Sequence, residues 1–150
     1  MRRTSLLLCV LLVGCSGSSP TAPSQSTPLT PIQLAGMWTG SLSFTLDGTS
    51  YSHAGTATLT QDQLHVAGTA NLSNDWRVNV DGILSGPGVL AQITAHITLD
   101  VPSNQPPIRC TAALDATSSQ AVPTMTFSAD SVTFSPCADT ITNVALTLRR

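Results

Sequence analysis

Residues 89–99 have the sequence Val-Leu-Ala-Gln-Ile-Thr-Ala-His-Ile-Thr-Leu, in which apolar and polar side chains alternate from Ala91 onward. One parity is apolar throughout and comprises Val89, Ala91, Ile93, Ala95, Ile97 and Leu99. The opposing parity comprises Gln92, Thr94, His96 and Thr98. Because successive side chains of a β-strand point to opposite faces, this period of two predicts a strand with one apolar face.

The same alternation recurs along most of the chain after residue 34. It occupies the runs 38–46, 56–60, 64–72, 76–81, 89–99, 108–116, 124–134 and 141–148. We expect the run 124–134 to break near Asp130. Turn-forming residues lie between several of the runs, at 47–48, 73–75, 85–88 and 103–107. No run has a sustained helical period, so the pattern predicts about eight short antiparallel strands in a barrel or a sandwich.

The alternation leaves open which face of the strands points inward. In an outer-membrane barrel the apolar face would meet lipid, and aromatic residues would form girdles at both membrane interfaces. This chain has only three Phe, two Trp and one Tyr, and it ends in Arg149-Arg150. We therefore expect the apolar parity to fill the interior, and Thr and Ser to cover the exterior.

The first run is preceded by Gly36-Met37, and Gly36-Met37-Trp38 resembles the Gly-x-Trp opening of lipocalins and related calycin barrels. The resemblance covers these three residues and the strand pattern. It implies an antiparallel up-and-down β-barrel of about eight strands in which Trp38 closes one end. It also implies that a basic residue of the last strand, Arg149 or Arg150, packs over the indole with a cation–π contact worth about 0.5–2 kcal/mol.

Residues 1–14 have the three parts of an export signal: two arginines, the apolar segment 6–13 and a small residue before Cys15. The apolar segment is shorter than the roughly 20 residues that a membrane helix needs. Residues 11–15 are Leu-Leu-Val-Gly-Cys and resemble a bacterial lipobox, which implies cleavage before Cys15 and acylation of that residue. The alternative is an ordinary cleaved signal with an incidental cysteine.

The resemblance to lipoprotein signals implies a location in the cell envelope, with the protein anchored to a membrane through acyl chains on Cys15. Ser16 follows the cysteine, which resembles outer-membrane rather than inner-membrane sorting in a Gram-negative bacterium. Residues 15–33 are rich in Ser, Thr and Pro, and we expect a disordered tether there. Residues 34–150 then form the β-barrel domain, facing the periplasm or the cell surface.

Charged residues are few, and all of them are Arg or Asp. The chain has six Arg and eight Asp, and two of the Arg lie in the predicted signal. Nucleic-acid binding requires clustered cations. Because Arg77, Arg109 and the pair Arg149-Arg150 are scattered along the sequence, we expect no nucleic-acid partner.

The predicted barrel domain contains two cysteines, Cys110 and Cys137. In an oxidising compartment an even pair favours a disulfide. A redox pair would usually have the spacing Cys-x-x-Cys, and a metal site would need further ligands at a fixed spacing. We therefore expect a structural disulfide between the sixth strand and the turn before the last strand, with no metal and no cofactor.

The three histidines are the side chains whose ordinary pKa lies nearest to neutrality. His65 and His96 lie on the polar parity of their runs, which predicts exposed side chains, and His53 lies next to a predicted turn. A metal site made of all three remains an alternative if their strands are neighbours. No serine lies in a Gly-x-Ser-x-Gly motif, and residue order alone assigns no catalytic triad, so we predict no catalytic residue and a protein that is not an enzyme.

These observations predict an envelope lipoprotein whose barrel is a binding module. We expect a small apolar ligand inside the barrel, or an envelope protein or glycan at rim loops near 47–53, 85–88 and 101–107. The residues expected to line a cavity are Leu42, Phe44, Val66, Trp76, Val78, Ile93 and Ile97.

Two alternatives remain for this function. The inward residues can simply fill the barrel, since eight strands enclose just enough space for side chains or for one small ligand. The protein would then be an interaction or inhibitor lipoprotein, similar to small disulfide-bonded lysozyme inhibitors, or a structural surface lipoprotein without a ligand. The volume of the interior separates these cases, because a small ligand needs an open cavity.

Overall fold

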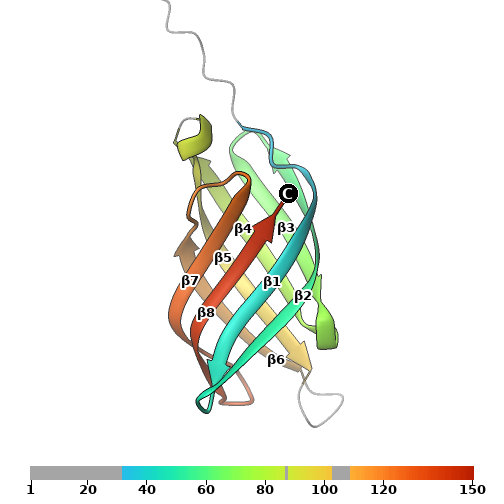
Figure 1. Ribbon diagram of the computed structural model, residues 1–150, viewed down its shortest axis with the longest axis vertical. Helices are drawn as coiled ribbons and strands as arrows, with labels where there is room; N and C mark the ends of the chain where they lie inside the picture. Colours follow the sequence, from blue (N-terminus) through green and yellow to red (C-terminus); the bar gives the residue numbers. More distant parts are fainter. Residues whose placement is uncertain (1–31, 87, 103–108) are drawn as a thin grey trace, which may run out of the picture.

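Eight antiparallel strands form a nearly closed barrel (Figure 1). They are β1 (Gly36–Leu46), β2 (Thr49–Asp62), β3 (His65–Leu72), β4 (Arg77–Ser85), β5 (Gln92–Pro102), β6 (Arg109–Thr117), β7 (Thr124–Thr133) and β8 (Thr140–Arg149). Two short 3-10 helices, η1 (Ser73–Asp75) and η2 (Gly88–Leu90), lie in the connections. The computed structural model describes residues 32–86, 88–102 and 109–150. The predictions for the signal, for Cys15 and for most of the tether lie outside these residues.

Every strand except β6 hydrogen-bonds to the strand that follows it, and β1 also pairs with β8. The resulting order is β6-β5-β4-β3-β2-β1-β8-β7, which leaves β6 and β7 as the two edges of the sheet. The edges meet at a bridge between Thr111 and Ser135, and near the other end the N–H of Ser119 donates to the carbonyl of Thr126 at 2.9 Å. The predicted antiparallel up-and-down barrel of about eight strands is confirmed.

A two-residue turn at Asp47-Gly48 joins β1 to β2. Both residues have positive φ, 49° and 77°, as a type I′ hairpin turn requires. β2 therefore begins at Thr49 and stays in register with β1 along the whole of β1. The prediction of a rim loop over residues 47–53 is wrong beyond residue 48, because the turn needs only two residues.

The apolar parity points inward and fills the barrel with a hydrophobic core. On β5 the core residues are at most 8% exposed, and they are Ile93, Ala95, Ile97, Leu99 and Val101. The strand begins later than its alternation suggested, since residues 89 and 90 belong to η2. Leu64, the first residue of the run 64–72, is half exposed because it lies in the turn between β2 and β3.

β7 runs through Asp130 without the predicted break, but its inward parity changes there. Met125 and Phe127 are buried before this residue, and Val132 is buried after it. The neighbouring strand β8 changes parity at Asn143, whose φ is 51°. The matching irregularities keep apolar side chains inside on both halves of the two strands.

Trp38 closes the pole of the barrel at which the described chain begins. Trp38 is 2% exposed, and its indole N–H donates to the carbonyl of Leu34 at 2.8 Å. The guanidinium of Arg150 lies 5.9 Å from the centroid of the indole. Gly36 has a φ of 129° and passes close to the Arg150 side chain. The cation–π partner of Trp38 is therefore Arg150.

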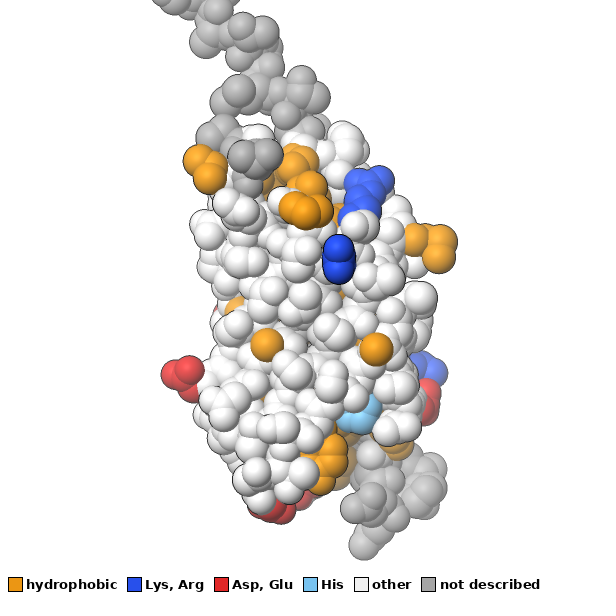
Figure 2. Space-filling model, viewed as in Figure 1, with side chains coloured by type: hydrophobic (Ala, Val, Ile, Leu, Met, Phe, Trp, Pro, Cys, Tyr) orange, Lys and Arg blue, Asp and Glu red, His pale blue; other side chains and the backbone are white. Residues whose placement is uncertain are grey.

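The outer face of the wall is polar. Figure 2 shows mostly uncharged polar side chains and backbone on the face that β1, β7 and β8 form, with few charged groups. Threonine hydroxyls bridge neighbouring strands, for example Thr126 with Thr147 at 3.2 Å and Thr133 with Thr140 at 2.9 Å. Neither of the two described helices is long and apolar enough to cross a membrane.

The predicted disulfide joins Cys110 of β6 to Cys137 in the connection between β7 and β8. Cys110 precedes Thr111, which forms the bridge with Ser135. The disulfide therefore fastens the two sheet edges to each other at one end of their seam.

Replacing Cys110 and Cys137 together by serine should lower the free energy of unfolding by about 3–4 kcal/mol, because the bridge closes a loop with a sequence separation of 27. Urea unfolding of the two proteins measures the difference. Dithiothreitol should destabilise the wild type to a similar extent and leave the double variant unchanged. A loss smaller than about 1 kcal/mol would mean that the bridge restrains the unfolded chain far less than its loop length implies.

Candidate functional site

A cavity of about 690 Å³ opens at the pole opposite to Trp38. The β1–β2 turn, η1 and the β7–β8 connection all lie at this pole, which we call the open pole (Figure 1). The described residues that line the cavity are mostly aromatic or aliphatic, and they are Phe44, Leu46, Tyr51, His53, Asn74, Trp76, Val101, Pro102, Cys110, Phe134, Pro136, Cys137, Asp139 and Ile141. The volume lies within the range of about 300–1,000 Å³ that small-molecule pockets span.

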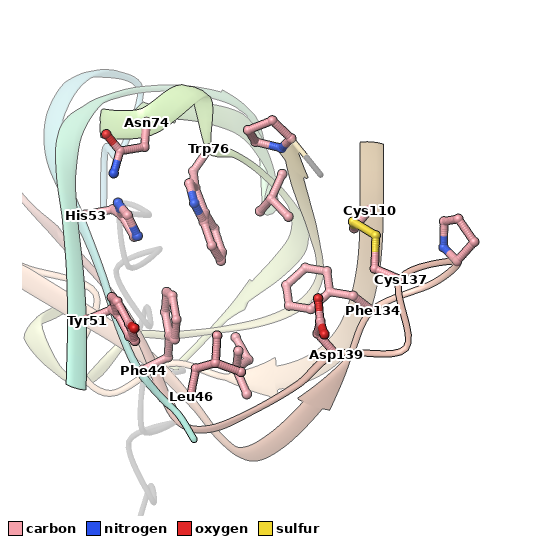
Figure 3. A pocket seen from close by; sticks show the side chains of 14 residues that line it. Phe44, Leu46, Tyr51, His53, Asn74, Trp76, Cys110, Phe134, Cys137 and Asp139 are labelled. Atoms are coloured by element: carbon pink, nitrogen blue, oxygen red, sulfur yellow. A yellow bond between two sulfur atoms is a disulfide. The ribbon is translucent and has the colours of Figure 1, made fainter. Parts of the chain in front are cut away.

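Four stacked rings form one wall of the cavity (Figure 3). Phe44 stacks on Tyr51 with ring centroids 5.5 Å apart and on Trp76 with centroids 4.9 Å apart, and His53 stacks on Trp76 at 4.9 Å. Phe134 lies on the other side of Trp76 from His53, and the planes of Trp76 and Phe134 meet at 87° with centroids 5.9 Å apart. We call the two perpendicular rings, Trp76 and Phe134, the aromatic corner.

The register of β1 and β2 explains how the stacked wall forms. Phe44 lies directly opposite Tyr51, and Leu42 lies directly opposite His53. Directly opposed residues of antiparallel strands share one face of the sheet. Because Leu42 and Phe44 point inward, Tyr51 and His53 do so too. Trp76 joins them from the connection that follows η1.

His53 is buried within the stacked wall, with 7% of its surface exposed. Its Nδ1 lies 3.3 Å from the hydroxyl oxygen of Ser73. Burial lowers the pKa of His53 below the ordinary value of 6.5, so the ring is neutral at neutral pH.

A serine beside a histidine also has the composition of a nucleophile and its base, but such a pair acts only when a third group orients the imidazole. The hydrogen bonds of the described residues give His53 no carboxylate partner, and Ser73 is its only side-chain contact of this kind. The Ser73 hydroxyl therefore acts to position the ring of His53 against Trp76.

Charge at the open pole is arranged unevenly. Among the described lining residues, Asp139 alone is acidic, and its backbone carbonyl accepts a hydrogen bond from the N–H of Phe134 at 2.8 Å. Arg109 donates from Nε to Asp100 at 2.7 Å and from Nη1 to Asp75 at 2.9 Å. The hydrogen bonds to Asp100 and Asp75 raise the pKa of Arg109 above its ordinary value. The positive charge of this guanidinium is therefore already paired with two carboxylates of the chain.

Two of the seven residues expected to line a cavity, Phe44 and Trp76, line this one. The other five are at most 1% exposed and belong to the packed core, and they are Leu42, Val66, Val78, Ile93 and Ile97. The disulfide cysteines Cys110 and Cys137 also line the cavity, whereas Gly36, Trp38, Arg149 and Arg150 lie at the closed pole. The middle of the barrel is filled, and the space lies at its open end.

His65 and His96 lie on the exterior, with side chains 50% and 58% exposed. Each contacts an aspartate of the next strand, His65 with Asp81 at 2.7 Å and His96 with Asp115 at 2.8 Å. His53 lies within β2 and on the inner face of the barrel, so the prediction that placed it beside a turn is wrong. Because His65 and His96 lie on the outer face, the three histidines do not converge. Within residues 32–86, 88–102 and 109–150 no group of three or more His, Cys or Asp side chains is arranged to hold a metal.

Sequence reasoning expected only Phe44 and Trp76 of the lining residues in a cavity. The lining residues that it did not expect there include Tyr51, His53, Asn74, Phe134 and Asp139. The first two had a signal, because a two-residue turn at Asp47-Gly48 places them opposite Phe44 and Leu42. Phe134 follows β7 directly and keeps the inward parity of Val132, whereas Asp139 lies in the irregular connection, where side-chain alternation no longer indicates direction.

Comparison of the chain with protein-family models, with curated proteins and with solved structures gave no match. The eight-stranded antiparallel barrel is consistent with the lipocalin-like fold that Gly36-Met37-Trp38 implies. The closed pole has the arrangement that the resemblance implies, because the buried indole of Trp38 lies beneath Arg150.

The stability of the protein should fall as the pH falls below about 6.5, because the unfolded chain then binds a proton at residue 53 that the buried ring of His53 resists. The decrease should continue down to the lowered pKa of the folded state. His53→Gln should remove this part of the decrease, as measured by urea unfolding at about pH 7.5 and about pH 5.5. His96→Gln, at an exposed position, is the matched control and should keep it. An unchanged decrease in His53→Gln would contradict the assignment to His53.

Proposed function

We propose that this protein is a non-enzymatic binding module that takes a small, largely apolar ligand into the cavity at the open pole. The observation that carries the proposal is the aromatic corner, which lines a cavity of about 690 Å³. Trp76 is only partly buried, and Tyr51 is 43% exposed. Aromatic surface left in water costs free energy that a ligand recovers by covering it.

The filled middle of the barrel supports a ligand site at its end. Leu42 is fully buried below the cavity, whereas Phe44, one inward position further along β1, forms part of the cavity lining. His53, Asn74 and Asp139 place a few polar groups around the apolar lining. A small number of polar groups in an apolar pocket is typical of sites that orient a small ligand.

 We further propose that the protein is anchored in the cell envelope through lipid on Cys15. The lipobox resemblance of residues 11–15 and the Ser, Thr and Pro content of residues 15–33 support this anchor. The disulfide suits an oxidising compartment such as the periplasm. The described chain begins at the closed pole, so a tether of this kind would leave the cavity facing away from the bilayer.

A neutral apolar probe, tert-butylbenzene, should bind to the purified protein at one saturable site, as measured by isothermal titration calorimetry. Trp76→Ala should weaken the binding by about tenfold or more, because it removes one ring of the aromatic corner. Trp38→Phe, at the closed pole, is the matched control and should bind as the wild type does.

The same control variant supplies a second readout. Trp38→Phe leaves Trp76 as the one tryptophan of the chain, so its fluorescence should change on binding in step with the calorimetric signal. Near-ultraviolet circular dichroism checks that each variant is folded. Equal weakening by both tryptophan substitutions, or no saturable binding at all, would contradict a ligand site at the open pole.

The anchor has its own test. When the chain is expressed with its leader in a Gram-negative host, the mature protein should begin at Cys15, carry acyl chains and sediment with membranes. Intact-mass measurement reports the acyl increment, and Cys15→Ser should remove both the increment and the membrane association. A wild-type protein that is recovered without acyl chains would contradict the anchor and leave the ligand site untouched.

A further inference from the structure

Two aromatic rings of the cavity lining lie nearly at right angles to each other. Trp76 and Phe134 form the aromatic corner, and Phe44 extends the Trp76 side of it with an interplanar angle of 27°. The face of an aromatic ring carries negative electrostatic potential. Rings that meet at an angle let one bound group contact more than one face, and such walls favour a positively charged group.

The described lining contains one acidic side chain, and a carboxylate attracts a cation as the ring faces do. Asp139 belongs to the cavity wall together with Phe134, whose backbone N–H donates to the Asp139 carbonyl at 2.8 Å. None of the salt bridges formed within the described ranges includes Asp139. The carboxylate can therefore pair with a ligand without breaking an ion pair of that part of the chain.

No cation among the described lining residues offsets this charge. His53 is neutral at neutral pH because burial lowers its pKa. Arg109 donates to Asp100 and Asp75, which hold its guanidinium at 2.7 Å and 2.9 Å. The aspartates of the described part of this pole outnumber its arginines, the two sets being Asp47, Asp75, Asp100 and Asp139 against Arg77 and Arg109.

We propose that the ligand of this cavity is an organic cation, an alkyl- or arylammonium compound with an apolar body. The ammonium group lies at the aromatic corner beside Asp139, and the body contacts the aliphatic lining of Leu46 and Ile141. This inference rests on the proposed function, since it adds a charge to a ligand that must first bind at the open pole.

Three probes of similar size separate charge from shape. Phenyltrimethylammonium is the cation, tert-butylbenzene has the same shape without charge, and benzenesulfonate is an anion. Calorimetric titration of the purified protein should show the cation binding about tenfold more tightly than its neutral counterpart, because only the cation gains from the ring faces and the carboxylate. Benzenesulfonate should bind most weakly.

Two matched variants locate the charge. Asp139→Asn should weaken binding of phenyltrimethylammonium by about threefold and leave tert-butylbenzene unchanged, because it removes a partly screened charge and no apolar surface. Asp47→Asn removes an aspartate of the same pole that does not line the cavity, and it should change neither affinity. Both positions are exposed, so neither substitution disturbs the core.

The outcomes distinguish this inference from the proposed function. If tert-butylbenzene binds as tightly as phenyltrimethylammonium and Asp139→Asn has no effect, the inference of a cationic ligand is refuted and the proposed ligand site stands. If benzenesulfonate binds most tightly of the three probes, the inference of a cationic ligand is likewise refuted. If no probe binds at the open pole, the proposed function fails and the cation fails with it.

Discussion

The hydrogen-bond ladders that β1 forms with β2 on one edge and with β8 on the other are the constraint on which the rest of the barrel depends. The ladder between β1 and β8 joins the first strand to the β7–β8 hairpin, so that the row of sequential strands curves into a barrel. The alternation of side chains along β1 then places Trp38, Leu42 and Phe44 on one inner face. β1 therefore contributes a buried residue to the closed pole, another to the packed middle of the barrel and a third to the cavity wall.

The fold was predictable because local and global signals agree along most strands. The alternation of residues 92–99 matches their burial residue by residue, and Asp47-Gly48 has the chemistry of the turn it forms. The expected break at Asp130 corresponds to a change of parity rather than an end of pairing, because β8 compensates at Asn143. Such compensation depends on a neighbouring strand, which a single run of sequence does not reveal.

The cavity lining was predictable only in part, because it too depends on contacts between segments that are distant in the sequence. Phe44 and Trp76 follow from inward parity, and a strict count across the two-residue turn would also have placed His53 inside. Parity alone does not separate a core residue from a cavity residue, since Leu42 and Phe44 share one face and differ only in distance from the pole. Asp139 depends on how the β7–β8 connection folds back over the barrel end, which the alternation does not describe.

The two sides of the cavity differ in how firmly the barrel holds them. Phe44 and His53 lie on strands with continuous ladders. Cys110 and Phe134 lie beside the seam between β6 and β7, which the Thr111–Ser135 bridge joins at this end within the described part of the chain. Segments with few backbone hydrogen bonds open at lower free energy than paired ones. The disulfide restrains this weaker side at the cavity itself, so it limits how far Phe134 can move from Trp76 and thereby preserves the aromatic corner.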